Sequence, residues 1–210
     1  MIRILIADDH RIVREGLKQI LAETPDMIVM DEASNGQEVL GKIWENDFDV
    51  VLLDISMPGR SGLDILKQLK SERPRLAVLV LSMYSEEQYA MRALRAGASG
   101  YMTKESAPDE LIEAIRKVST GRKYISPTVA EKLAVSLEAK DERPAHENLS
   151  DREYQVMCMI ASGKTIKSIA DELSLSVKTV STYRTRILEK MRMKNNAELT
   201  HYSIQNRLVE

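Results

Sequence analysis

The sequence is poor in the side chains that form covalent or metal cross-links. Its 210 residues include one cysteine and three histidines. Cys158 lies in the apolar stretch VMCMIA and has no second cysteine to pair with, so it is predicted to be a small buried hydrophobic residue. Because His10, His146 and His201 are far apart in the chain, they form no recognisable zinc motif, and a structural metal is not expected.

Long hydrophobic runs are also missing. No apolar stretch approaches the roughly 20 residues that cross a bilayer, and the N-terminal MIRILIADDH has an acidic pair where a signal peptide would continue. The 43% of hydrophobic residues is nevertheless enough for packed cores, and the length allows one large domain or two small ones. We therefore expect a globular cytoplasmic protein that does not enter the membrane.

The net charge of −2 conceals an asymmetry along the chain. Residues 1–121 carry 15 Lys+Arg against 20 Asp+Glu, a net charge of −5, whereas residues 148–210 carry 10 against 7, a net charge of +3. Within the second region, residues 164–194 hold 8 basic and 3 acidic side chains, which is a modest basic patch. The opposite signs suggest two different partners.

Short apolar runs typical of β-strands alternate with helical patterns in the first half of the chain. The strand-like runs cover residues 2–7, 27–33, 49–54, 76–82 and 99–102. Between them, apolar residues recur three and four positions apart, which is the helix period. Because the runs are almost continuously apolar, the strands are expected to be buried on both faces. The pattern predicts an α/β fold with a five-stranded, doubly wound parallel sheet.

The pattern changes after a last helix at 108–120. Residues 126–140 predict a linker helix, and the charged, proline-containing stretch 141–148 predicts a flexible connector. From Leu149 onward every segment has the helix period, and SDRE offers a capping box at Ser150 and Glu153. We therefore expect a first domain at 1–121, a linker at 122–147 and an all-α domain at 148–210.

Three carboxylates are predicted to meet at the carboxyl edge of the sheet, where open α/β sheets form their sites. Asp8 and Asp9 follow the first strand, and Asp54 ends the third. Packed like charges raise one another's pKa, and a hard divalent cation such as Mg²⁺ would keep these groups ionised. Once its charge is screened, Asp54 can act as a nucleophile toward phosphorus and form an acyl phosphate.

Two further strand ends carry complementary groups. Ser82 closes the fourth strand with a hydroxyl, and Lys104 follows the fifth with a cation suited to a phosphoryl oxygen. Any one of these residues taken singly is more often a helix cap or a turn former. The joint pattern on four strand ends is what favours a functional site.

The first domain resembles the receiver domain of two-component response regulators. Four segments carry this resemblance: IADDH, VVLLDISMPGRSG, LVLS and AGASGYMTKES. The resemblance implies that Asp54 is the phosphoacceptor and that a sensor histidine kinase is the donor. It also implies that Asp8, Asp9 and Asp54 hold Mg²⁺ together with the backbone carbonyl of Ser56. By the same resemblance Ser82 and Tyr101 are switch residues, and Lys104 pairs with the phosphoryl group. Phosphorylation would draw Ser82 inward and let Tyr101 turn into the vacated space; alternatively, Tyr101 is a half-exposed strand aromatic.

One feature departs from this pattern. Many receivers have proline after the lysine, whereas Glu105 follows Lys104 here, so a cis peptide bond is not assumed.

In the second domain, TIKSIADEL (165–173), a three-residue SLS and VKTVSTYRTRILEKM (177–191) have the spacing of a helix-turn-helix motif. On the second helix five apolar residues are expected to pack inward: Val177, Val180, Ile187, Leu188 and Met191. Small hydroxyls flanked by cations then face outward, which suits the major groove of DNA. A solvated basic helix face is the alternative.

The stretch from LSDREYQ to RILEKM resembles the LuxR/NarL-type DNA-binding domain, a four-helix domain with a helix-turn-helix motif. By that resemblance three residues would face bases: Ser181, Thr182 and Thr185. Seven more are candidates for phosphate contacts: Lys164, Thr165, Lys178, Thr179, Arg184, Arg186 and Lys190. Many members have histidine in place of Tyr183. The last helix, at 195–208, would be either a dimer contact on DNA or a cap on the domain core.

Together these features predict a response regulator of the NarL/LuxR type that is not an enzyme beyond assisting phosphoryl transfer to its own Asp54. Its expected partners are a histidine kinase, double-stranded promoter DNA and a second copy of the chain, which would pair on phosphorylation to span two half-sites. A phosphatase or phosphotransferase is a rival, although Ser56 stands where haloacid-dehalogenase-like phosphatases have a second aspartate. A regulator whose first domain acts only by binding, without accepting phosphate, is another.

Overall fold

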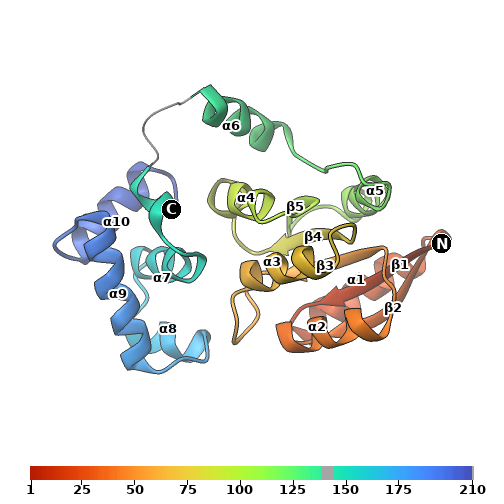
Figure 1. Ribbon diagram of the computed structural model, residues 1–210, viewed down its shortest axis with the longest axis horizontal. Helices are drawn as coiled ribbons and strands as arrows, with labels where there is room; N and C mark the ends of the chain where they lie inside the picture. The colour runs from red at the N-terminus through yellow and green to blue at the C-terminus, as the bar shows by residue number, and fades with distance from the viewer. Residues whose placement is uncertain (139–143, 210) are drawn as a thin grey trace. The chain divides into compact units, whose positions relative to one another are not determined.

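The computed structural model describes residues 1–138 and 144–209, which form two compact units, Met1–Ala130 and Glu131–Glu210 (Figure 1). None of the helices in these ranges is long and apolar enough to cross a membrane.

The first unit is built on a parallel sheet with the strand order β2-β1-β3-β4-β5. Its strands are β1 (Ile2–Ala7), β2 (Met27–Ala33), β3 (Val50–Asp54), β4 (Ala77–Ser82) and β5 (Gly100–Thr103). Every residue of β3 and β4 is buried, as expected for central strands covered on both faces. The five strands fall within one residue of their expected positions, and the doubly wound fold is confirmed.

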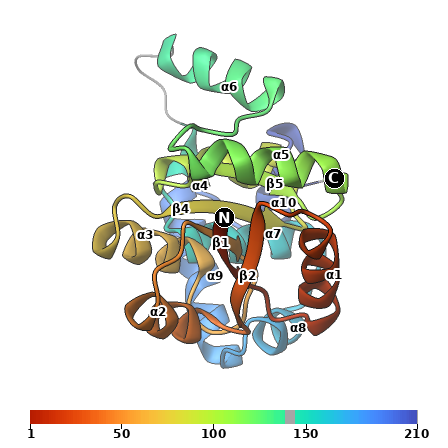
Figure 2. The ribbon, with the colours of Figure 1, turned by 90° about the vertical axis from the view of Figure 1, so that its right-hand side faces the viewer.

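Five helices cover the sheet: α1 (Arg11–Ala22), α2 (Gly36–Glu45), α3 (Gly62–Glu72), α4 (Glu86–Arg95) and α5 (Pro108–Ser119). In Figure 2, α1 and α2 lie on opposite sides of β1 and β2. Alternate strand residues such as Ile4, Leu52 and Leu79 share one apolar core with Leu17 of α1 and Ile115 of α5. These layers leave the carboxyl ends of the strands at one edge of the sheet.

A glycine allows α3 to begin close beneath the end of β3. A Cβ atom on Gly62 would lie 2.3 Å from Cα of Ile55, far inside van der Waals contact. Only a residue without a side chain fits this close approach. The glycine at the end of the stretch LLDISMPGRSG therefore sets the path of the loop that follows Asp54.

The second unit contains four helices: α7 (Asp151–Ala161), α8 (Ile166–Glu172), α9 (Val177–Met191) and α10 (Asn196–Gln205). The expected capping box is present, because Ser150 accepts from the backbone N–H of Glu153 while Glu153 accepts from that of Ser150. The side chains of Thr165, Ser176 and Asn195 cap the other three helices. Each of the four helices in the second unit therefore begins with a polar N-cap residue.

Two local expectations differ from the structure. The connector was expected to be flexible up to residue 148, but Ala145–Asn148 form a 3₁₀ helix, η1, in which the His146 ring lies 2.9 Å from the hydroxyl of Tyr202. Residues 141–143 and the last two residues of the expected linker helix lie outside the described residues; α6 spans Pro127–Glu138. In addition, Val177 does not pack inward. It is 50% exposed, because it begins α9 at a position that the neighbouring helices do not cover.

Candidate functional site

Two buried aspartates stand side by side at the carboxyl edge of the sheet. Adjacent parallel strands β1 and β3 are in register with Ala7 opposite Leu53, so the next residues, Asp8 and Asp54, are neighbours. Asp8 is 2% exposed and Asp54 is 1% exposed. Strand order alone therefore brings together two carboxylates that are 46 residues apart in the sequence.

Lys104 connects these two aspartates. It follows β5, and its Nζ lies 2.6 Å from Oδ2 of Asp8 and 2.7 Å from Oδ2 of Asp54. Burial raises the pKa of Asp54 above its usual value even though Lys104 acts in the opposite direction. Burial alone would lower the pKa of Lys104, but the two carboxylates outweigh it and raise that pKa. The ammonium is therefore held charged beside the predicted phosphoacceptor.

Backbone groups fix the other carboxylate oxygens. Oδ1 of Asp54 accepts a 2.8 Å hydrogen bond from the backbone N–H of Ser56, and Oδ1 of Asp8 accepts one of 2.8 Å from that of His10. Arg14 of α1 donates a 2.7 Å hydrogen bond to the backbone carbonyl of Asp8, which connects the loop after β1 to α1. Both carboxylates are thus preorganised by short local contacts.

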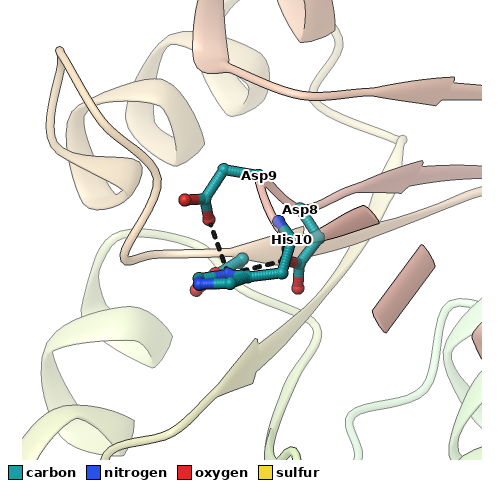
Figure 3. Close-up of side chains that lie close together, drawn as sticks. Asp8, Asp9 and His10 are labelled. Carbon is teal, nitrogen blue, oxygen red and sulfur yellow. Dashed lines mark hydrogen bonds and ion pairs between the residues drawn. The ribbon is translucent and has the colours of Figure 1, made fainter. Parts of the chain in front are cut away.

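Asp9 and His10 complete a cluster with the two buried aspartates, and Figure 3 shows Asp8, Asp9 and His10 side by side. One ligand atom from each of Asp8, Asp9, His10 and Asp54 lies within 4.8 Å of all the others. Oδ1 of Asp9 is buried and accepts no hydrogen bond from the described residues, although Nδ1 of His10 lies 3.1 Å away. Carboxylate oxygens, one of them unsatisfied, are the donor set that suits a hard divalent cation, so the residues present fit Mg²⁺.

His10 was missed by the sequence analysis. The three histidines were judged by their distance from one another, but the informative signal was the position of His10 directly after the acidic pair.

Ser82 and Tyr101 lie on the neighbouring strands. Ser82 is fully buried, and its Oγ accepts a hydrogen bond of 3.1 Å from the backbone N–H of Tyr84. Tyr101 is only 2% exposed, so the alternative of a half-exposed aromatic is wrong for this conformation, and burial raises the pKa of its hydroxyl. The backbone N–H of Lys104 donates to the carbonyl of Ser82 at 2.8 Å, which joins the two strand ends.

The peptide bond between Lys104 and Glu105 is trans, since the described part of the chain contains no cis peptide bond.

In the second unit, α9 presents the expected hydroxyl face. Ser181, Thr182 and Thr185 are exposed, as are Lys178 and Arg186. The hydroxyls of Thr182 and Thr185 donate to backbone carbonyls one turn earlier, at 2.9 and 3.2 Å. Small hydroxyl side chains flanked by two cations are thus exposed on this helix.

The other candidate residues already have partners within the unit. Lys164 pairs with Glu172 at 2.6 Å, Lys190 with Glu153 at 2.6 Å, and Arg184 donates to Asn196 at 2.7 Å. Thr165 caps α8, and the Thr179 hydroxyl lies 2.8 Å from that of Ser176. By contrast, Lys178 and Arg186 have no side-chain partner among the described residues. Tyr183, where many family members have histidine, is half-buried.

A doubly wound sheet with a buried Asp-Lys-Asp cluster at its carboxyl edge, linked to a helix-turn-helix unit, defines the class of receiver proteins with a helical output unit. Comparison with family models agrees. The response regulator receiver domain matches residues 4–116, and the LuxR family of bacterial regulatory proteins matches residues 147–203. The chain belongs to the two-component response regulators with a LuxR-type helix-turn-helix DNA-binding domain.

Relatives resemble the chain over its whole length. The response regulator GacA of Pseudomonas aeruginosa is 38% identical over 211 residues, covering 100% of this chain and 99% of the relative. The response regulator UvrY of Escherichia coli is 36% identical over 209 residues, covering 99% of this chain and 96% of the relative. The similarity therefore extends over both units of the chain.

A similar solved structure is that of RcsB from Salmonella enterica serovar Typhimurium bound to the promoter rprA in the presence of the phosphomimetic BeF₃⁻. It is 26% identical, covers 96% of this chain and 98% of that chain, and has a TM-score of 0.66. The structure of the response regulator ChrA of a heme-sensing two-component system is 31% identical to this chain and has a TM-score of 0.53. The match covers 99% of this chain and 98% of ChrA.

Proposed function

We propose that Asp54 accepts a phosphoryl group from the phosphohistidine of a sensor kinase. A carboxylate oxygen of Asp54 attacks the phosphorus, the bond to the kinase histidine breaks, and an acyl phosphate forms on Asp54. The observation that carries this proposal is the position of Lys104, 2.7 Å from Oδ2 of Asp54, where its ammonium can neutralise the oxygens of the incoming group. The chain assists transfer only to its own Asp54 and is not otherwise an enzyme.

Mg²⁺ fits this cluster, and it would be held by Asp8, Asp9 and Asp54 with the backbone carbonyl of Ser56. When bound, it would neutralise the carboxylates and the phosphoryl oxygens. Oδ1 of Asp9 supports this assignment. It is buried and accepts no hydrogen bond from the described residues, although Nδ1 of His10 lies 3.1 Å away, and such an oxygen is costly to bury unless a cation meets it.

Ser82 and Tyr101 are the proposed switch residues. A phosphoryl group on Asp54 offers new acceptor oxygens to the Ser82 hydroxyl, which now accepts from the backbone of Tyr84. Reorientation of Ser82 would loosen the loop from Met83 to Ser85, to which the Tyr101 hydroxyl is bonded. The switch therefore acts on the segment that leads into α4.

The phosphorylated chain is proposed to act in the cytoplasm as a dimer that binds promoter half-sites and regulates transcription. Its receiver would span 1–121, its linker 122–147 and its DNA-binding domain 148–210. Ser181, Thr182 and Thr185 would face bases. Lys178 and Arg186, which have no side-chain partner among the described residues, are the first candidates for phosphate contacts. Lys164, Thr165, Thr179, Arg184 and Lys190 would contribute only by exchanging their present partners.

The test is the intact mass of the protein after incubation with Mg²⁺ and acetyl phosphate. A single phosphoryl adduct is expected on the wild type and none on Asp54→Asn. Asp64→Asn, a change of a carboxylate in the first turn of α3, serves as the matched control and should retain the adduct. A folded wild type that stays unmodified both with acetyl phosphate and with an autophosphorylated kinase would favour the regulator that acts by binding alone. Continuous release of phosphate with turnover would favour the phosphatase rival.

A further inference from the structure

The ring of His10 turns toward the acidic cluster instead of capping its own helix. His10 is the N-cap residue of α1, yet its side chain makes no capping hydrogen bond. Its Nδ1 lies 3.1 Å from Oδ1 of Asp9 and 3.4 Å from Oδ1 of Asp8, and Figure 3 shows the ring beside both carboxylates. The side chain is 64% exposed, so packing does not force this orientation.

Nitrogen and oxygen atoms this close need a positive charge or a proton between them. An unprotonated imidazole nitrogen and a carboxylate oxygen are both acceptors, and their lone pairs repel. A divalent cation placed between them accepts both lone pairs and so satisfies the nitrogen and the oxygen together.

The spacing of the three atoms is that of neighbouring metal ligands. Metal bonds of about 2.0–2.2 Å at right angles or tetrahedral angles place adjacent ligand atoms roughly 3.0–3.5 Å apart. The two distances from Nδ1, 3.1 and 3.4 Å, fall in this range. Asp54 adds a further oxygen within 4.8 Å, so one ion can reach all four side chains.

We propose that His10 Nδ1 is an additional ligand of the aspartate site and that it gives this site a preference for imidazole-binding divalent metals, such as Ni²⁺ or Zn²⁺, over Mg²⁺. The inference rests on the proposed function insofar as the same aspartates hold the cation. An all-oxygen site suits Mg²⁺, whereas imidazole adds affinity for later first-row metals and little for Mg²⁺. The identity of the bound ion would then depend on which metals are available.

The experiment is calorimetric titration of the full-length protein with NiCl₂ and, separately, with MgCl₂. His10→Asn removes the nitrogen ligand while keeping a good N-cap residue for α1. His201→Asn removes an exposed histidine of α10 and controls for surface binding. Since loss of even an outer partner costs tenfold or more in metal affinity, His10→Asn should weaken Ni²⁺ binding by at least about tenfold and Mg²⁺ binding by less than about threefold.

A second measurement identifies the atom. In a nitrogen NMR titration of isotope-labelled histidine with diamagnetic Zn²⁺, the Nδ1 resonance of His10 should shift at one equivalent, and that of His201 should not. Equal losses of Ni²⁺ and Mg²⁺ affinity in His10→Asn, or an unshifted His10 resonance, would overturn the inference while leaving the magnesium site intact. Failure of the wild type to bind Mg²⁺ at all would overturn both this inference and the proposed magnesium site.

Discussion

The hydroxyl of Tyr101 on β5 donates a hydrogen bond of 2.8 Å to the backbone carbonyl of Tyr84 in the loop that follows β4. The backbone N–H of the same Tyr84 donates to Oγ of Ser82. Both proposed switch residues therefore hold one loop residue, from opposite sides of its backbone. A reorientation of Ser82 would therefore act directly on Tyr84, the residue that anchors the Tyr101 ring.

Tyr101→Phe should loosen this loop without emptying the core. The phenyl ring remains, but the hydrogen bond to Tyr84 is lost, so the free energy of unfolding should fall by about 1 kcal/mol. Hydrogen exchange should also accelerate in residues 83–85. Urea unfolding and exchange mass spectrometry measure the two effects. Tyr124→Phe is the control, because the Tyr124 hydroxyl makes no hydrogen bond to the described residues. Equal exchange rates in wild type and Tyr101→Phe would contradict the anchoring role.

Lys104→Met should be strongly destabilising in the absence of metal. It removes the only side-chain cation that contacts both Asp8 and Asp54 among the described residues, and breaking a buried pair costs about 3 kcal/mol or more. Saturating Mg²⁺ should restore part of this loss, because a cation would then meet the same carboxylates. Urea unfolding with and without Mg²⁺ measures both. Lys18→Met, which breaks a more exposed pair with Glu15, should change little, and a metal-independent loss in Lys104→Met would argue against a cation site.

Gly62→Ala and Gly41→Ala should change the free energy of unfolding in opposite directions. The first places a methyl group 2.3 Å from Cα of Ile55, and the resulting shift of the loop after β3 should cost about 2 kcal/mol. The second lies inside α2 with no atom within 4 Å of the new methyl group, so it should stabilise by about 0.5–1 kcal/mol. Thermal or urea unfolding distinguishes them. A neutral Gly62→Ala would show that the close approach is readily relieved.

Glu153 should make the stability of the second unit depend on acidity. Burial alone would raise the pKa of Glu153, but Lys190 and Ser150 outweigh it and lower this pKa below its ordinary value of 4.5. A lowered folded-state pKa means that the stabilisation is fully present above the unfolded-state pKa and is lost as pH falls through the folded-state value.

Glu153→Gln keeps the capping geometry but removes the charge. Because Lys190 is partly exposed, the loss at neutral pH should be about 1 kcal/mol at most, and it should disappear at acidic pH. Urea unfolding over a descending pH series measures this convergence. Glu189→Gln on the exposed face of α9 should show no such trend, and parallel pH curves for wild type and Glu153→Gln would contradict the assignment.

The two cations of α9 without partners should dominate the electrostatic part of DNA binding. Lys178→Ala and Arg186→Ala should each reduce the slope of log K against log salt by about one unit per subunit, in any duplex sequence. Lys164→Ala should reduce it less, because Lys164 must first leave Glu172. Fluorescence anisotropy of the phosphorylated protein with duplex DNA over a salt series measures the slopes. Equal slopes for all three variants would show that the pairs observed within the unit do not persist on DNA.

Much of the fold and part of the site could be anticipated because their signals are local. Five apolar runs predicted the bounds of the strands to within one residue, and SDRE predicted the capping box of α7. Val177 was misjudged because helical periodicity gives a face but not where neighbouring helices stop covering it. The segment 145–148 was misjudged because its charge and proline hide a 3₁₀ turn that is held by a contact between His146 and Tyr202, 56 residues away.

The sequence by itself determined that Asp8, Asp9 and Asp54 follow strand ends, since apolar periodicity and chain order depend only on neighbouring residues. Only the tertiary structure decided how these groups pair. The order β2-β1-β3-β4-β5 puts Asp8 beside Asp54, the length of the Lys104 side chain lets it cross from β5 to both, and the turn after β1 points His10 toward the carboxylates. Such contacts depend on register, rotamer and burial, which arise when distant segments pack together, and no local pattern in the sequence records them.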